Sequence, residues 1–413
     1  MELTKYKLGD IVTLLNGRAY LMPELQDAGK YRILRVGNLS GGNDSWYYSD
    51  MELDENKYCE NGDLLYAWAC NFGPHIWKEE KVIYHYHIWK LVENKEKVDR
   101  SYLYYYLLHQ TPFYLGGVNG ATMVHITKKN MEKKTVYIPS SLKVQHRIAS
   151  ILSTYDALIE NNTKRIRLLE KMAESLYKEW FVRFRFPGHE KVEMENGLPK
   201  GWKRGTLSDV VEFQNGFAFK SDTFCNDGMY SIVTIKNVQA EGFDGSNTDK
   251  IAEIPQNMPG YCKLRQGDIL ISLTGNIGRV CRVQGYGYLL NQRVAKLRSS
   301  FPFYTYCLFK SDYIFQSLNV ISYGTAQLNL SPIKASKIRV AIPSQKNIEY
   351  FEHNVSSMFN EIDNLQHQNS LLARQRDFLL PRLMSGKLEV KTEKTTEKNG
   401  YGRYAYNCSK REL

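Results

Sequence analysis

The stretch that decides the fold is SLKVQHRIASILSTYDALIENNTKRIRLLEKMAESLYKEWF, residues 141–181. Apolar residues recur in it at alternating spacings of four and three, which is the seam of a coiled-coil helix. An α-helix of this length measures about 60 Å, more than the width of a small domain. The seam residues are Ile148, Leu152, Tyr155, Ile159, Asn162, Ile166 and Leu169, and the same spacing continues to Ala173, Leu176 and Trp180.

A second stretch, residues 345–380, repeats the pattern, although Arg376 interrupts it near its end. Asn162 and Asn369 are amides within otherwise non-ionic seams, and such amides fix helix alignment at a cost in stability. Two long helices, each following a globular segment of similar size, predict one structural unit used twice. The second seam comprises Ile348, Phe351, Val355, Met358, Ile362, Leu365, Asn369 and Leu372.

An internal repeat supports this duplication. LGDIVTLLNGRA at 8–19 returns as LSDVVEFQNGFA at 207–218, and NFG at 71–73 returns as NIG at 276–278. The offset stays near 200 over about 180 residues, which indicates a tandem duplication rather than chance similarity.

Each globular half combines β-branched or alternating runs, typical of strands, with short helical patterns. We therefore expect an α+β fold: two mixed α/β domains in a pseudo-two-fold arrangement, separated by two long helices packed as an antiparallel coiled coil. The first helix should stop at Phe186-Pro187-Gly188, and Pro381 should kink or end the second. The predicted segments are 1–139 (first domain), 140–186 (first helix), 187–202 (linker), 203–342 (second domain), 343–386 (second helix) and 387–413 (disordered tail).

The composition narrows the function. Lys plus Arg is 55 and Asp plus Glu is 44, giving +11 and a pI near 9.0, which favours a polyanionic partner. The seven cysteines form no CxxC pair, and no apolar stretch reaches the ~20 residues of a membrane span. Motifs of nucleotide hydrolysis, dinucleotide binding, metalloproteolysis, serine hydrolysis and adenine methylation are absent from the sequence. We expect a cytoplasmic, non-catalytic protein without bound metal or cofactor.

Three local motifs carry a family resemblance: WFVRFRFPG (180–188), GLPKGW (197–202) and LLPRLMSGKL (379–388). Together with the duplication they resemble the specificity subunits of type I restriction–modification systems. The resemblance implies two target recognition domains joined by spacer helices. It implies double-stranded DNA, two methyltransferase subunits and, through them, restriction subunits as partners. S-adenosylmethionine, ATP and Mg²⁺ would then belong to those partners. A two-domain coiled-coil scaffold that binds proteins rather than DNA is the alternative.

Residues that read DNA are Arg, Lys, Asn, Gln and aromatic side chains on loops and strand edges. Residues that differ between the halves are better candidates for specificity than the repeated Asp63/Asp268 and Asn71/Asn276, which more simply hold the shared fold. The Asn-Gly turns also have a purely structural interpretation, because Asn-Gly forms turns regardless of function. The candidates are Arg18, Tyr20, Arg35, Asn38, His85, His87 and Lys128 in the first half, and Phe219, Lys220, Lys236, Asn237, Asn276, Arg279, Gln292, Arg293, Tyr323 and Gln327 in the second.

Overall fold

The computed structural model describes residues 2–39, 45–70, 72–115, 126–240, 242–246, 248–322 and 329–390. The chain divides into two compact units, one formed by residues 1–156 with the chain from 374 onward, the other by 157–373. This division cuts through both long helices, so each unit contains one globular domain and a part of each helix. The long helices are α4 (Leu142–Tyr177) and α8 (Gln345–Met384).

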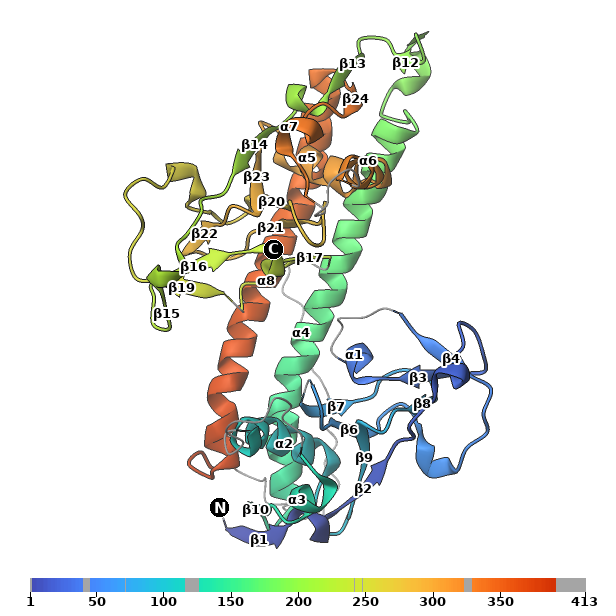
Figure 1. The fold of residues 1–413 in the computed structure, drawn as a ribbon, viewed down its shortest axis with the longest axis vertical. Coiled ribbons are helices and arrows are strands. Elements are labelled where there is room, and N and C mark those ends of the chain that lie inside the picture. The colour runs from blue at the N-terminus through green and yellow to red at the C-terminus, as the bar shows by residue number, and fades with distance from the viewer. Residues whose placement is uncertain are drawn as a thin grey trace, which may run out of the picture. The chain divides into compact units, whose positions relative to one another are not determined.

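The first domain is closed by its ends, because β1 pairs antiparallel with β10. Inside this closure lie two four-stranded sheets with the orders β2-β9-β6-β7 and β4-β3-β8-β5 (Figure 1). The strands are β1 (Leu3–Lys7), β2 (Val12–Asn16), β3 (Tyr31–Leu34), β4 (Tyr47–Ser49), β5 (Tyr58–Cys59), β6 (Leu64–Ala67), β7 (Gly73–Ile76), β8 (Val82–Tyr84), β9 (Ile88–Glu93) and β10 (Thr135–Pro139); the helices are α1 (Val36–Leu39), α2 (Arg100–Leu115) and α3 (Lys128–Glu132).

The second domain repeats this plan. β13 pairs with β24, and the sheet β14-β23-β20-β21 matches the first sheet strand for strand. In the other sheet β16 runs parallel to β22, as β3 runs parallel to β8. The strands are β11 (Met194–Glu195), β12 (Leu198–Pro199), β13 (Lys203–Thr206), β14 (Glu212–Asn215), β15 (Phe224–Cys225), β16 (Tyr230–Val233), β17 (Val238–Gln239), β18 (Gly242–Phe243), β19 (Asp249–Ile251), β20 (Ile269–Ser272), β21 (Val280–Arg282), β22 (Tyr288–Leu290), β23 (Val294–Arg298) and β24 (Arg339–Ile342); the helices are α5 (Pro302–Lys310), α6 (Asp312–Ser322) and α7 (Pro332–Ala335).

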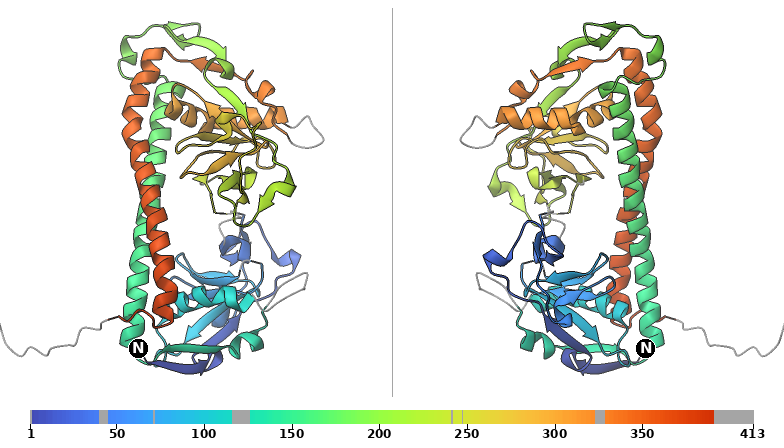
Figure 2. Two further views of the ribbon diagram at one scale, coloured as in Figure 1. Left: turned by 90° about the vertical axis from the view of Figure 1, so that its left-hand side faces the viewer. Right: turned by 90° about the vertical axis from the view of Figure 1, so that its right-hand side faces the viewer.

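Within each unit α4 and α8 lie side by side and run in opposite directions (Figure 2). In the second unit Asn162 contacts Gln368, and one turn further along α4 Arg165 meets Glu361, which lies earlier in α8. In the first unit Ile148 and Leu152 share a core with Leu380, Leu383 and Met384 of α8. The expected mixed fold with tandem domains and two long paired helices is confirmed.

The end of the first long helix lies earlier than predicted. The α-helical part stops at Tyr177, and a π-helical turn at Lys178–Val182 follows it. Phe184 then adopts a left-handed backbone with φ of 59°, which an α-helix cannot accommodate. The prediction that this helix continues to Phe186 is therefore wrong.

Pro381 does not end α8, which continues to Met384. A proline removes one backbone donor, but Leu383 and Met384 are buried in the first core and hold the last turn in place. The chain leaves the helix at Gly386, whose φ of 73° is a glycine conformation.

Candidate nucleic-acid interface

The structure brings most candidates of the first half to one end of its two sheets, which we call loop edge 1. Loop edge 1 consists of residues 17–20 after β2, 35–38 after β3, Trp68 after β6, and the turn 85–87 between β8 and β9. Backbone bonds join these segments: the Arg18 N–H donates to Tyr84 O at 3.0 Å, and the His85 N–H donates to Leu34 O at 2.9 Å. Residues far apart in sequence thus form one surface.

The second half forms an equivalent surface, loop edge 2, from residues 216–220, 234–239, 273–279 and 291–293. The Phe217 N–H donates to Leu290 O at 2.9 Å, and the Asn291 N–H donates to Val233 O at 3.1 Å. These two bonds are the counterparts of those made by Arg18 and His85. The duplication therefore extends to the backbone of the two edges.

The glycines of the two Asn-Gly turns are required by this frame. A Cβ on Gly17 would lie 2.4 Å from His85 O, and a Cβ on Gly216 would lie 2.0 Å from Asn291 O. Real Cβ atoms do not approach a carbonyl oxygen so closely, so the chain passes here only without a side chain. This geometry supports the structural interpretation of the Asn-Gly turns.

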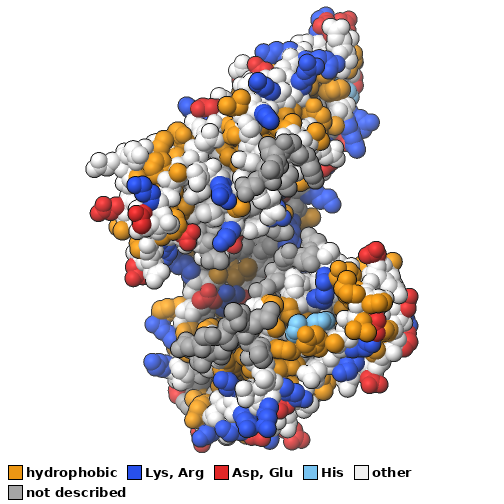
Figure 3. All heavy atoms as spheres, in the orientation of Figure 1, with side chains coloured by type: hydrophobic (Ala, Val, Ile, Leu, Met, Phe, Trp, Pro, Cys, Tyr) orange, Lys and Arg blue, Asp and Glu red, His pale blue; other side chains and the backbone are white. Residues whose placement is uncertain are grey.

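Aromatic side chains cover loop edge 1. His85, Tyr86 and His87 contact one another, with ring centroids 4.0–4.8 Å apart, and Trp68 meets the edge of His87 at 5.0 Å. Tyr20 stacks on His85 at 6.4 Å. Figure 3 shows histidine side chains set among hydrophobic ones on this part of the molecule. Trp68 and Tyr86 were not among the sequence candidates, although Tyr86 stands between two chosen histidines.

The imidazole of His85 is uncharged at neutral pH. Burial lowers its pKa to about 4, with further contributions from the neighbouring His87 and from Arg35. Burial also lowers the pKa of His87. Desolvation disfavours the charged imidazolium, so both side chains present a neutral ring.

The arginines of loop edge 1 are engaged by neighbouring groups. The guanidinium of Arg18 forms a two-pronged ion pair with Glu24, at 2.6 and 3.0 Å. Arg35 lies over the ring of Tyr47 at 4.3 Å and donates to Ser45 O at 3.3 Å. Asn38 holds its own turn, since its side-chain oxygen accepts from the Arg35 N–H.

Loop edge 2 has a different chemistry, because its exposed side chains are polar and largely cationic. Arg279 is the most constrained, since its guanidinium donates to the side chain of Gln239 at 2.9 Å. Phe219 is half-buried against Phe217, with ring centroids 5.1 Å apart. The exposed candidates are Lys220, Lys236, Asn276, Gln292 and Arg293.

Two candidates lie away from an exposed reading surface. Asn237 is only 1% exposed. Its side-chain oxygen accepts from the Thr234 N–H and its side-chain N–H donates to Asp244 O, so it holds the loop instead of facing a ligand. Lys128 lies on α3, which contacts the segment Leu8–Asp10 before β2, whereas loop edge 1 begins after β2. It also pairs with Glu132 on its own helix at 3.7 Å. The candidates Tyr323 and Gln327 and the repeated Asn71 lie outside the residues that the structure describes.

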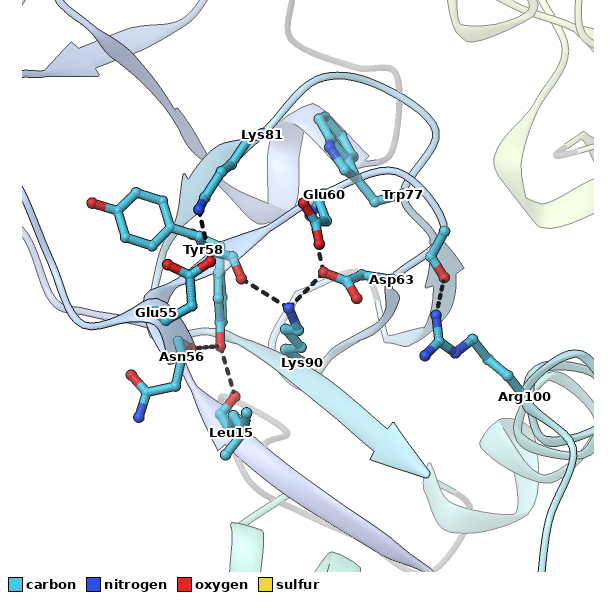
Figure 4. A network of polar contacts seen from close by, with 12 residues as sticks. Leu15, Glu55, Asn56, Tyr58, Glu60, Asp63, Trp77, Lys81, Lys90 and Arg100 are labelled. Carbon is cyan, nitrogen blue, oxygen red and sulfur yellow. Dashed lines mark hydrogen bonds and ion pairs between the residues drawn. The ribbon is translucent and has the colours of Figure 1, made fainter. Parts of the chain in front are cut away.

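An ion pair between mostly covered side chains recurs in both halves, at the residue before β6 and at the residue before β20. Lys90 meets Asp63 at 2.6 Å, and Lys296 meets Asp268 at 2.9 Å. Figure 4 shows Asp63 also accepting from the Glu60 N–H, while Lys90 donates to Tyr58 O. The repeated aspartates hold the shared fold, as the sequence comparison indicated.

The predicted helix seams are buried or half-buried along both helices. Asn162 donates to Gln368 and Asn369 donates to Thr163, both at 3.4 Å, so the two seam amides meet each other's neighbours rather than each other. Arg376 interrupts the second seam because it pairs with Asp156 on α4, and Asp156 also accepts from the Tyr105 hydroxyl of α2. This triad fastens the first domain to both helices.

The motifs 180–188 and 197–202 contact each other. Trp202 lies against Phe181, Phe184 and Phe186, with ring centroids 5.3–5.9 Å apart. Phe181 and Phe186 are buried in the core of the second unit. These aromatic side chains therefore seal that core and fix the entry into the second domain.

Two absences apply to the described ranges. No helix within them has the length and apolar character that a membrane crossing requires. No group of three His, Cys, Asp or Glu side chains there could hold a metal ion.

The fold and the two loop edges define a duplicated binding protein: one backbone frame used twice, with different side chains, on two long helices. The comparisons agree with this class. Residues 2–171 and 199–372 match the model of the type I restriction modification DNA specificity domain. The chain belongs to this family, that of the specificity subunits of type I restriction–modification systems.

Relatives and a solved structure that are similar to this chain cover most of its length. The type I restriction enzyme MjaVIII specificity subunit of Methanocaldococcus jannaschii is 25% identical over 405 residues, covering 93% of this chain and 92% of the relative. The EcoBI specificity subunit of Escherichia coli is 21% identical over 401 residues, covering 90% and 82%. The crystal structure of an S subunit from M. genitalium shares the fold, with a TM-score of 0.54, 16% identity and coverage of 93% and 96%.

Proposed function

We propose that this chain selects the DNA sequence on which a type I restriction–modification complex acts, and that its target is bipartite and asymmetric. Each loop edge reads one block, and the helices α4 and α8 act as the spacer between the two reading domains. The observation that carries the proposal is the pair of loop edges, which share a backbone frame but present unlike side chains.

The chemistry of the edges fits DNA. Loop edge 2 exposes Lys220, Lys236 and Arg293, and such side chains neutralise phosphates and contact base edges. Loop edge 1 exposes aromatic and imidazole rings, which contact bases. Because the side chains of the two edges differ, the two blocks should differ as well.

The catalytic work belongs to partners in this proposal. The chain recruits two methyltransferase subunits and, through them, the restriction subunits. S-adenosylmethionine, ATP and Mg²⁺ are bound by those subunits, and the complex works in the cytoplasm. Leu158, Leu168 and Met172 support a protein partner on α4, because they are apolar and 45–62% exposed.

Mapping methylated adenines in the host genome, with and without this gene, tests the proposal. The expected result is a gene-dependent motif of two unlike blocks separated by bases that are not read. One uninterrupted block would contradict it. A second measurement titrates salt against binding of the assembled complex to duplex DNA, where affinity should fall steeply as salt rises. Binding to proteins with no salt-dependent DNA binding would instead indicate a scaffold.

A further inference from the structure

We propose that one three-residue turn in each half sets which bases that half accepts. These are reading turn 1, residues 85–87, and reading turn 2, residues 291–293. Reading turn 1 takes thymine through its C5-methyl group, whereas reading turn 2 takes guanine through its major-groove acceptors. This inference rests on the proposed function.

The two turns occupy the same position in the same frame. The Tyr86 N–H donates to Arg18 O, and the Gln292 N–H donates to Phe217 O, both at 3.0 Å. Each turn is closed by a bond across its ends, Ile88 N–H to His85 O and Val294 N–H to Asn291 O, also 3.0 Å each. The sequence His-Tyr-His in one turn thus replaces Asn-Gln-Arg in the other without a change in backbone bonding.

The turns are also connected to their sheets in the same way. His87 O accepts from the Trp68 N–H at 3.1 Å, and Arg293 O accepts from the Leu273 N–H at 3.0 Å. Neither turn depends on its own side chains for these bonds. The first side chain of each turn adds a bond within the turn: His85 Nδ1 accepts from the His87 N–H at 3.5 Å, and Asn291 Oδ1 accepts from the Arg293 N–H at 3.3 Å. The side chains of Tyr86, Gln292 and Arg293 take no part in these bonds and can serve a ligand.

Reading turn 1 offers ring faces rather than charges. Tyr86 is 38% exposed, and the indole N–H of the adjacent Trp68 is engaged by Tyr86 O at 2.8 Å, which leaves its ring as the contact surface. Of the two arginines of loop edge 1, Arg35 lies over the ring of Tyr47 and Arg18 is neutralised by Glu24. The low pKa of His85 keeps its imidazole neutral. A surface of this kind contacts the thymine methyl, the one apolar group in the major groove.

Reading turn 2 offers a guanidinium and an amide. Arg293 and Gln292 are exposed, and no acidic side chain within the described residues pairs with Arg293. Arginine binds guanine O6 and N7 with two hydrogen bonds, the commonest specific contact to DNA. The exposed Lys220 and Lys236 belong to the same loop edge and can hold the flanking phosphates.

The first test uses the wild-type protein in its assembled methyltransferase complex, with a duplex carrying the mapped motif. Thymines in the first block are replaced one at a time by deoxyuridine, which lacks the methyl group. Guanines in the second block are replaced by 7-deazaguanine, which lacks N7. We expect affinity to fall about 3- to 10-fold at one position or more in each block. No loss at any thymine of the first block, or no thymine there at all, would overturn the assignment of reading turn 1. No loss at any guanine of the second block, or no guanine there at all, would overturn the assignment of reading turn 2.

The second test places the sequence of reading turn 2 in reading turn 1 by the triple change His85→Asn, Tyr86→Gln and His87→Arg. We expect the methylated motif to change in its first block and to keep its second block. The single change Tyr86→Gln serves if the triple variant does not fold, and should abolish the sensitivity to deoxyuridine. Tyr137→Gln is the matched control, because Tyr137 is 50% exposed on β10, away from loop edge 1.

The outcomes separate this inference from the function on which it rests. If the wild-type complex shows no salt-dependent DNA binding and no two-block motif, the proposed function fails. If it shows both, yet the grafted protein still methylates the original first block, only the role of the reading turns fails.

Discussion

Removing the charge of Asp63 should destabilise the first domain far more than removing an exposed carboxylate. In the folded chain Asp63 and Lys90 form an ion pair at 2.6 Å, and their side chains are only 14% and 18% exposed. Asp63→Asn keeps the shape, and an amide oxygen in the place of Oδ2 can still accept from the Glu60 N–H and from Lys90. The Lys90 ammonium nevertheless loses its counter-charge and is left with two neutral acceptors, that oxygen and Tyr58 O. A desolvated cation without its counter-ion is the source of the expected cost.

The magnitude follows from the degree of burial. Breaking a fully buried pair by removing one partner costs about 3–5 kcal/mol, whereas an exposed pair is worth about 0–1 kcal/mol. With both side chains mostly but not fully covered, we expect Asp63→Asn to cost about 2–3 kcal/mol. The double variant Asp63→Asn with Lys90→Met removes the stranded charge and should recover at least half of that cost.

Chemical denaturation followed by tryptophan fluorescence measures this, because Trp68, Trp77 and Trp89 lie in the first unit. The exposed pair Arg298–Glu212, at 69% and 59% exposure, supplies the control Glu212→Gln, which should change stability by less than about 0.5 kcal/mol. If Asp63→Asn costs no more than this control, or if the double variant is less stable than the single one, the reasoning fails.

Three further predictions concern other parts of the frame. Gly216→Ala places a Cβ 2.0 Å from Asn291 O and should cost about 3 kcal/mol in denaturant unfolding, while Gly260→Ala, where the Cβ meets open space, should cost less than about 1 kcal/mol. Trp202→Ala empties the aromatic cluster at the start of the second domain and should cost about 3–4 kcal/mol, seen as a lower midpoint of thermal unfolding. The pKa of His85 is about 4 in the folded chain against 6.5 ordinarily, so the unfolded chain binds more protons between these values. Stability should therefore fall as pH drops through this window, by at most about 3 kcal/mol, and His85→Asn should flatten the pH dependence of unfolding.

Periodic and repeated features of the fold were predictable from the sequence. The helix seams follow from a spacing that only an α-helix satisfies, and Ile148, Ile166 and Phe351 are buried as that spacing requires. The duplication separated shared from divergent residues. Asp268 is shared and supports the fold, whereas His85 and Asn291 are divergent and occupy equivalent positions at the loop edges.

Features that depend on the particular conformation of a loop or on side-chain packing were not predictable. The sequence does not indicate that Glu24 neutralises Arg18, nor that the side-chain N–H of Asn237 donates to Asp244 O. Each of these contacts turns a side chain of the DNA-reading type into a structural one. The early end of α4 likewise goes with the packing of Phe181 and Phe186 against Trp202. Trp202 lies outside the helical repeat, so the repeat does not indicate this contact.

The way the edges are held would allow two halves of one origin to read different DNA, as we propose. The turns 85–87 and 291–293 are fixed by backbone bonds, to Arg18 O in one half and to Phe217 O in the other, and these bonds do not depend on side-chain identity. Changing an exposed turn residue therefore costs little stability, within about 0.5 kcal/mol for surface sites, while it replaces the group offered to a base. The close approach of the backbone to each turn requires glycine at positions 17 and 216, because any side chain there would push the turn away. The same backbone hydrogen bonds therefore let the exposed side chains of the turns differ between the halves and require that the two glycines stay the same.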